Sequence, residues 1–132
     1  MKKKVLILMG SESDRDKMEK AIPILRDAGV EVSVAVSSAH RQPDRTAELA
    51  RTARAEGFSV VICGAGLSAA LPGVVAAHTE LPVIGVPLNA ALGGLDALLS
   101  VAQMPPGVPV ACVGIDNARN AAHLALRILQ LS

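Results

Sequence analysis

Short runs rich in valine and isoleucine alternate with helical stretches along this chain, and that alternation constrains its fold more than any other feature. The apolar runs lie at residues 5–9, 30–36, 59–64, 82–86 and 108–113. Apolar spacing, together with start and stop residues, predicts helices at about 13–29, 43–56, 68–78, 92–102 and 117–131. Pro23 falls inside the first of these helices and predicts a kink there.

Strands that alternate with helices form a parallel sheet with helices on both faces. Right-handed crossovers then wind the chain over the sheet in both directions. We therefore predict a three-layer α/β fold in which five parallel strands form a doubly wound sheet with the flavodoxin-like order 2-1-3-4-5. The length of 132 residues suits one domain, so we expect residues 1–132 to form a single ligand-binding domain.

Composition excludes several classes of protein. Hydrophobic residues make up 51% of the chain and the net charge is +1, which argues against a disordered chain and against nucleic-acid binding through bulk charge. Phe58 is the single aromatic residue, so the chain lacks the stacking platforms of single-strand binders. We expect no nucleic-acid partner.

Charged residues are concentrated in the first half of the chain. Residues 1–57 hold twenty of the 25 charged residues, and residues 58–77 hold none. Gly64, Gly66, Pro72 and Gly73 interrupt that uncharged stretch, so we read it as a buried strand and a loop rather than a membrane span. A surface this poor in charge would be adhesive unless covered, and it therefore predicts a homo-oligomer.

The cysteines and the N-terminal segment bear on the cellular compartment. Cys63 and Cys112 both lie in apolar runs and are expected to be buried free thiols, as in a reducing compartment. The apolar run 5–9 is too short for the core of a signal peptide, which favours a cytoplasmic protein. No His/Cys/carboxylate spacing of a metal site is present, and His78 and His123 are expected to be structural or surface residues.

Ligands of such folds bind beyond the carboxyl ends of the strands. The first of these ends carries Gly10, Ser11, Ser13 and Asp14. The serine hydroxyls and the following helix N-terminus suit an anion, while the carboxylate of Asp14 suits sugar hydroxyls better than a phosphate. The alternative is that Ser13 or Asp14 only caps the helix.

Polar or glycine-rich residues also follow the next three apolar runs. Ser38, His40 and Arg41 follow the second, where Arg suits an anion and His a proton transfer, unless the pair is simply exposed on the surface. Residues 64–73 follow the third and are mostly small, so backbone amides can approach a ligand closely. Asn89 and the glycine pair at 93–94 follow the fourth. Together these loops predict a small phosphorylated ligand.

Five motifs in order resemble one enzyme family. They are Gly10-Ser11-x-Ser13-Asp14, Ser38-Ala39-His40-Arg41-x-Pro43-Asp44, the segment 64–73, Leu81-Pro82-Val83-Ile84-Gly85-Val86-Pro87 and Gln103-Met104-Pro105-x-Gly107-Val108-Pro109-Val110. The chain resembles the N5-carboxyaminoimidazole ribonucleotide mutase family of purine synthesis, also called the catalytic subunit of phosphoribosylaminoimidazole carboxylase, from about Val5 to Leu129.

The resemblance implies a reaction and a site. Such an enzyme moves a carboxylate from an exocyclic nitrogen to a ring carbon of an aminoimidazole ribonucleotide, without metal or other cofactor, and assembles as an octamer. His40 would transfer the proton, and imidazole has an ordinary pKa of about 6.5, which suits that step. Substrate would be bound by Ser11, Ser13, Asp14, Ser38 and Arg41 at the ribose phosphate and by Gly64, Ala65, Gly66, Ser68, Ala70 and Leu71 at the carboxylate or carbon dioxide.

Two other functions stay open at this point. The first is a carboxylase that applies carbon dioxide or bicarbonate directly to an aminoimidazole or pyridine nucleotide. The second is a ribonucleotide-binding domain without activity. Ala70 stands where many members of the family have a histidine, so His40 is the one histidine within the motifs.

Overall fold

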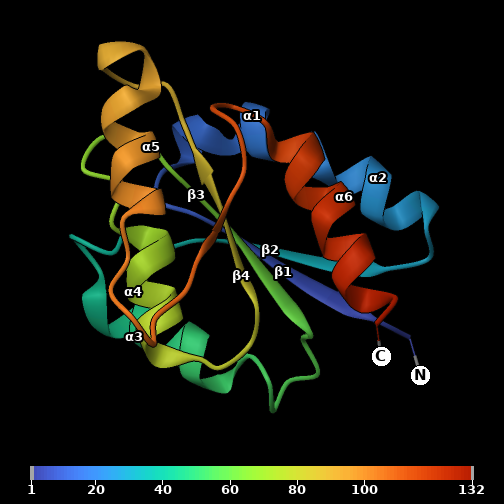
Figure 1. Cartoon of the computed structure of the whole chain (residues 1–132). Coiled ribbons are helices and arrows are strands. Elements are labelled where there is room, and N and C mark those ends of the chain that lie inside the picture. Colours follow the sequence, from blue (N-terminus) through green and yellow to red (C-terminus); the bar gives the residue numbers. More distant parts are fainter. Residues whose placement is uncertain (1, 132) are drawn as a thin grey trace.

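A five-stranded parallel sheet forms the middle layer of the protein (Figure 1). The structure is a computed structural model, and it describes residues 2–131. The strands are β1 (Lys4–Met9), β2 (Glu31–Val36), β3 (Val60–Ala65), β4 (Val83–Pro87) and β5 (Ala111–Cys112). Their order is β2-β1-β3-β4-β5 and every neighbouring pair is parallel. The predicted fold class and strand order are confirmed.

Helices cover both faces of this sheet (Figure 1). One face carries α1 (Arg15–Met18), α2 (Ala21–Asp27) and α6 (Ala118–Leu129), and the 3-10 turn η1 (Glu12–Asp14) leads into α1. The opposite face carries α3 (Pro43–Thr52), α4 (Leu71–His78) and α5 (Leu95–Ala102), and the 3-10 turn η2 (Leu92–Gly94) leads into α5.

Alternate residues of the central strands build two separate cores. In β1, Val5, Ile7 and Met9 belong to the core beneath α2 and α6, while Leu6 and Leu8 belong to the core beneath α3, α4 and α5. A strand with a helix layer on each side must be apolar on both sides. This is why the strands read in the sequence as continuous apolar runs rather than as alternating ones.

The first predicted helix is broken, and Pro23 causes the break. Proline has no N–H to donate to the carbonyl four residues earlier, which here belongs to Glu19. The Ile22 N–H bonds that carbonyl instead, at 3.0 Å, and the helix divides into α1 and α2 around residues 19–20. The predicted kink is confirmed and lies one turn before the proline.

The fifth strand and three helix boundaries correct the predictions. Residues 108–113 were expected to form a strand, but β5 covers only Ala111–Cys112, because Pro109 has no N–H for the ladder. The helix expected from residue 68 begins at Leu71, since Ser68 has a left-handed φ of +49°. α3 and α6 end at Thr52 and Leu129, before the predicted 56 and 131.

The two cysteines are free thiols in different surroundings. Cys63 on the central strand β3 is buried, as predicted, and burial raises the pKa of its thiol. Cys112 is only half-buried, because it lies on the edge strand β5. The prediction that both thiols are buried is therefore wrong for Cys112.

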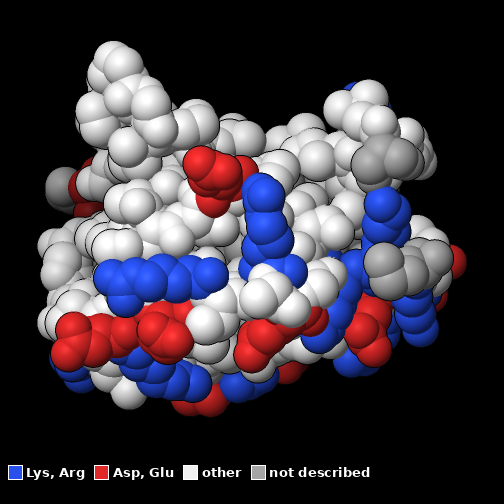
Figure 2. Space-filling view, turned by 90° about the horizontal axis from the view of Figure 1, so that it is seen from below, with Lys and Arg blue, Asp and Glu red and all other residues white. Residues whose placement is uncertain are grey.

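Charge is distributed unevenly over the surface. Figure 2 shows charged side chains in a band across the lower half of the view and a largely uncharged region above it. Three leucines on η2 and α5 are at least half exposed: Leu92, Leu95 and Leu99. Within residues 2–131, no helix is both long enough and apolar enough to cross a bilayer.

Candidate active site

A cavity of about 470 Å³ opens beyond the carboxyl ends of β1, β2 and β3. All of the site residues predicted from the sequence line it, with the exception of Gly64. The complete lining is Gly10, Ser11, Ser13, Asp14, Ser38, Ala39, His40, Arg41, Ala65, Gly66, Leu67, Ser68, Ala70, Leu71 and Ala90. Loops that are distant in the sequence meet here because parallel strands end at the same edge of the sheet.

The first wall is the turn that follows β1. Ser11 caps η1: its Oγ accepts a hydrogen bond from the Ser13 N–H at 3.2 Å and lies 2.9 Å from the Ser13 Oγ. The alternative in which Ser13 or Asp14 only caps the helix is not supported: the side-chain cap comes from Ser11, and Asp14, at the N-cap position of α1, makes no capping hydrogen bond. The Asp14 carboxyl is half-buried, and this burial raises its pKa above the ordinary value.

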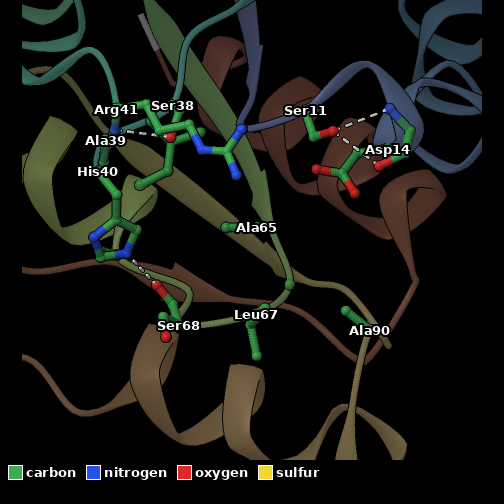
Figure 3. Close-up of a pocket in the computed structure, with 15 residues that line it drawn as sticks. Ser11, Asp14, Ser38, Ala39, His40, Arg41, Ala65, Leu67, Ser68 and Ala90 are labelled. Atoms are coloured by element: carbon green, nitrogen blue, oxygen red, sulfur yellow. Dashed lines mark hydrogen bonds between the residues drawn. The ribbon is translucent and has the colours of Figure 1, made fainter.

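The second wall is the turn between β2 and α3. The Ser38 Oγ accepts a hydrogen bond from the Arg41 N–H at 3.1 Å. Beneath the turn, the buried hydroxyls of Ser37 and Thr46 lie 2.7 Å apart and fasten the end of β2 to α3. The Arg41 side chain is exposed and extends across the cavity toward the wall that carries Ser11 and Asp14 (Figure 3).

The third wall is the loop between β3 and α4. His40 Nε2 lies 2.9 Å from the carbonyl oxygen of Ser68, so this nitrogen carries the hydrogen and donates it (Figure 3). The left-handed backbone of Ser68 belongs to the turn that presents this carbonyl. A contact over 28 positions of sequence therefore joins the histidine of the second wall to the third wall.

Gly64 has a structural task within the core. A Cβ added to it would lie 2.3 Å from the Sδ of Met18, so the absence of a side chain lets Met18 of α1 pack onto β3. Gly64 is fully covered and does not line the cavity. A glycine at this position is consistent with the close approach of a ligand and also with the close packing of a side chain. The sequence alone does not distinguish these two explanations.

Four residues of the lining were not among the predicted site residues: Gly10, Ala39, Leu67 and Ala90. Gly10 and Ala39 are direct neighbours of predicted site residues. Leu67 belongs to the third wall and is 72% exposed. Ala90 follows β4 and packs against the third wall, since a Cβ added to Gly66 would lie 2.8 Å from the Ala90 Cβ. Its signal in the sequence was its position just after the fourth apolar run.

The remaining titratable groups lie elsewhere. His78 ends α4 and His123 lies on α6, and neither lines the cavity. Among the described residues, no three His, Cys, Asp or Glu side chains are grouped so that they could hold a metal ion. The cavity itself offers one guanidinium, four serine hydroxyls, one carboxylate, one imidazole and a loop of mostly small residues.

Comparisons with known proteins match this arrangement. The model of the family described as AIR carboxylase matches residues 4–132. The chain is 57% identical to the N5-carboxyaminoimidazole ribonucleotide mutase of Pyrococcus abyssi over 97% of this chain and 74% of the relative, and 56% identical to that of Methanocaldococcus jannaschii over 96% and 79%. Treponema denticola PurE superposes with a TM-score of 0.88 at 32% identity, covering 98% of this chain and 82% of that one. By family match, sequence identity and fold, this chain belongs to the AIR carboxylase family.

Proposed function

We propose that this protein is an N5-carboxyaminoimidazole ribonucleotide mutase of purine biosynthesis, which interconverts that compound and 4-carboxy-5-aminoimidazole ribonucleotide. Relatives that are 53–57% identical to this chain over the aligned residues carry this name. The observation that carries the proposal is the position of His40: an imidazole whose Nε2 donates to the third wall, beside a guanidinium and hydroxyls suited to a ribose phosphate.

The ribose phosphate would bind between the first and second walls. Arg41 offers the planar, permanently charged group that pairs best with a phosphate, and Ser11, Ser13 and Ser38 offer hydroxyl donors. A carboxylate repels phosphate, so we assign Asp14 to the ribose hydroxyls. The oxygens of this half-buried carboxyl can accept hydrogen bonds, which ribose hydroxyls donate.

The reacting carboxylate would lie against the third wall. Ala65, Gly66, Ser68 and Ala70 bring little side-chain bulk there, so backbone groups can approach the ligand. The side chain of Leu71, which begins α4, is buried in the core. Carbon dioxide released into this part of the cavity would stay close to the ring, and confinement replaces a bimolecular encounter with an oriented one.

The proton balance of the reaction needs one proton to be delivered and one to be removed. When the bond between N5 and the carboxyl carbon breaks, the electron pair stays on N5, which then gains a proton. When the ring carbon C4 attacks carbon dioxide, C4 must lose a proton to restore aromaticity. We assign both transfers to His40, which as an imidazolium donates its Nε2 proton and as a neutral ring accepts the second.

The variant His40→Asn tests this assignment. We expect kcat to fall by roughly 10²- to 10⁴-fold, the usual contribution of a general acid–base group, with binding of aminoimidazole ribonucleotide and the unfolding midpoint close to those of the wild type. Asn120→Ala, on the surface of α6, is a matched control for handling and folding. Activity of His40→Asn within a few-fold of the wild type would refute the role.

The proposed contact between Arg41 and the phosphate can be tested by removing first the guanidinium and then the phosphate. Arg41→Ala should weaken binding of the ribonucleotide by roughly 10- to 150-fold, the worth of a charge-assisted hydrogen bond. The same variant should bind the phosphate-free aminoimidazole ribonucleoside as the wild type does. An equal loss for both ligands would place Arg41 away from the phosphate.

A direct carboxylase is the second candidate, because the matching family is described as AIR carboxylase. The two activities separate in one assay. The mutase interconverts the N5 isomer and 4-carboxyaminoimidazole ribonucleotide at low bicarbonate, whereas a direct carboxylase needs aminoimidazole ribonucleotide and high bicarbonate.

We also propose that the protein is a cytoplasmic homo-oligomer, and specifically an octamer. The exposed leucines Leu92, Leu95 and Leu99 and the low charge of residues 58–132 support a surface covered by other copies. The free thiols Cys63 and Cys112 agree with a reducing compartment. Light scattering coupled to size exclusion measures the assembly, and a monomer at micromolar concentration would refute it.

A further inference from the structure

Asp116 makes a contact that joins three separate segments of the chain. Its Oδ1 accepts a hydrogen bond from the Asn89 N–H at 2.9 Å and another from the Lys17 Nζ at 3.1 Å. Lys17 Nζ also donates to the Asn89 carbonyl at 3.2 Å. We call Lys17, Asn89 and Asp116 the Asp116 clamp. It connects α1, the loop after β4 and the turn before α6.

The backbone conformation of Asp116 indicates that its surroundings hold this residue in place. Its φ is +59°, a left-handed conformation that costs energy for every residue with a side chain, although least for Asp and Asn. Such positions persist where the surroundings fix them. Here the Asp116 N–H donates to the Pro87 carbonyl at 2.8 Å, so main chain and side chain of one residue both hold the loop after β4.

The clamp lies behind one wall of the candidate active site. Asn89 precedes Ala90, which lines the cavity. Gly66 of the third wall packs directly on Ala90, and the Leu88 N–H donates to the Ala65 carbonyl at 3.0 Å. A displacement of residues 88–90 would therefore move the part of the third wall to which the reacting carboxylate has been assigned.

The clamp also reaches the opposite side of the cavity. Lys17 lies on α1, immediately after the Ser11–Asp14 turn. Its ammonium group and the Asp116 carboxylate are each a little more than one-third exposed, with side-chain exposures of 38% and 35%. An ion pair at that exposure contributes little through charge alone. What the contact supplies is a direct link between α1 and the loop after β4.

We propose that Lys17 and Asp116 are positioning residues for substrate binding, which hold Ala90 and Gly66 at the pocket without touching the substrate. The assignment of a substrate rests on the proposed function. The clamp itself can be examined without any substrate, through the protection of the backbone amides that it holds.

The decisive variant is Asp116→Gly. Glycine accepts a φ of +59° without strain, so this change removes the carboxylate and leaves the backbone conformation allowed. Lys17→Met removes the ammonium group from the other side of the contact. Lys20→Met is the matched control, because Lys20 carries the same charge near Asp116 and acts on it through that charge.

Hydrogen exchange of residues 88–91 is the first measurement. We expect faster exchange in Asp116→Gly and Lys17→Met than in the wild type, and unchanged exchange in Lys20→Met. Exchange in Asp116→Gly that equals the wild type would overturn the clamp, whatever the substrate of the enzyme is.

Steady-state kinetics with 4-carboxyaminoimidazole ribonucleotide is the second measurement. A wall that contacts substrate and transition state alike affects KM and leaves kcat nearly unchanged, so we expect KM to rise roughly three- to tenfold in Asp116→Gly. A variant that is merely less folded would instead lose kcat at constant KM. Faster exchange with an unchanged KM would therefore overturn the positioning role. Failure of the wild type to turn over this substrate would refute the proposed function. The hydrogen-exchange result would still show whether the Asp116 clamp holds residues 88–91.

Discussion

The contact between Gly64 and Met18 gives a prediction whose size can be worked from the structure. A Cβ on Gly64 would lie 2.3 Å from the Met18 Sδ, 2.8 Å from its Cε and 3.0 Å from its Cγ. The overlap reaches the Cγ, so rotation of the methionine end does not relieve it. Overpacking of a core costs about 1–3 kcal/mol, and alanine in a strand recovers roughly 0.5–1 kcal/mol relative to glycine. Gly64→Ala should therefore destabilise the protein by about 0–2.5 kcal/mol.

A double-mutant cycle isolates this contact. Met18→Ala alone should cost about 2–5 kcal/mol, because it opens a cavity in a fully buried position. In the double variant the new Cβ fills part of that cavity, so the sum of the single effects should exceed the double effect by about 1–2 kcal/mol. Urea unfolding at fixed protein concentration measures all four proteins, and the fixed concentration matters for an oligomer.

Gly10→Ala is the matched control for this cycle. Gly10 also lies at the carboxyl end of a central strand, but a Cβ added there meets nothing within 4 Å. Its substitution should change the free energy of unfolding by less than about 0.5 kcal/mol. Strict additivity of Gly64→Ala and Met18→Ala would refute the packing explanation for Gly64.

Three further outcomes follow from single residues. Gly94→Ala should cost about 1–3 kcal/mol in urea unfolding, because Gly94 has a φ of +85° and its added Cβ would lie 2.6 Å from Ile115 Cγ2. Burial alone would raise the pKa of Asp116, but hydrogen bonds from Asn89 and Lys17 outweigh it and hold the pKa below the ordinary value. Its contribution to stability is therefore present above the unfolded pKa of about 3.9 and is lost as the pH falls through the folded pKa, so Asp116→Asn should flatten the acid limb of a stability–pH curve. The Cys63 thiol, buried and with a raised pKa, should resist iodoacetamide until denaturant is added, and labelling under native conditions would contradict that burial.

The strand order and three walls of the cavity were predictable because each follows from a local pattern. A buried parallel strand needs an uninterrupted apolar run, and the residues after it must lie at one edge of the sheet. Ser11, Ser38 and Ser68 each follow such a run, and each lines the cavity. Their roles toward a substrate stay predictions, which the variants described above are designed to test.

What could not be predicted depends on contacts between distant segments. Lys17 and Asp116 are 99 positions apart, and neither is unusual in its local sequence. The bond from His40 to the Ser68 carbonyl depends on a left-handed residue that is not a glycine, and composition gives no signal for it. Gly64 looked like a ligand contact because both explanations for a buried glycine, a nearby ligand and a nearby side chain, require the same residue.

The topology explains why the charge-rich and charge-poor halves of the chain meet at one pocket. The helices that follow β1 and β3 leave toward opposite faces of the sheet, and a crevice opens between them. The loops after β1 and β2 belong to the charged residues 1–57, and they bring Asp14 and Arg41 to one side. The loop after β3 belongs to the uncharged segment 58–77 and brings mostly small, weakly polar residues to the other side. A carboxylate loses its charge when it leaves as carbon dioxide, and weakly polar surroundings favour the neutral product over the anion. The charge-free segment 58–77 therefore does two things: it supplies the buried central strand β3, and it supplies the weakly polar loop at the end of β3 where we propose that the carboxyl group is transferred.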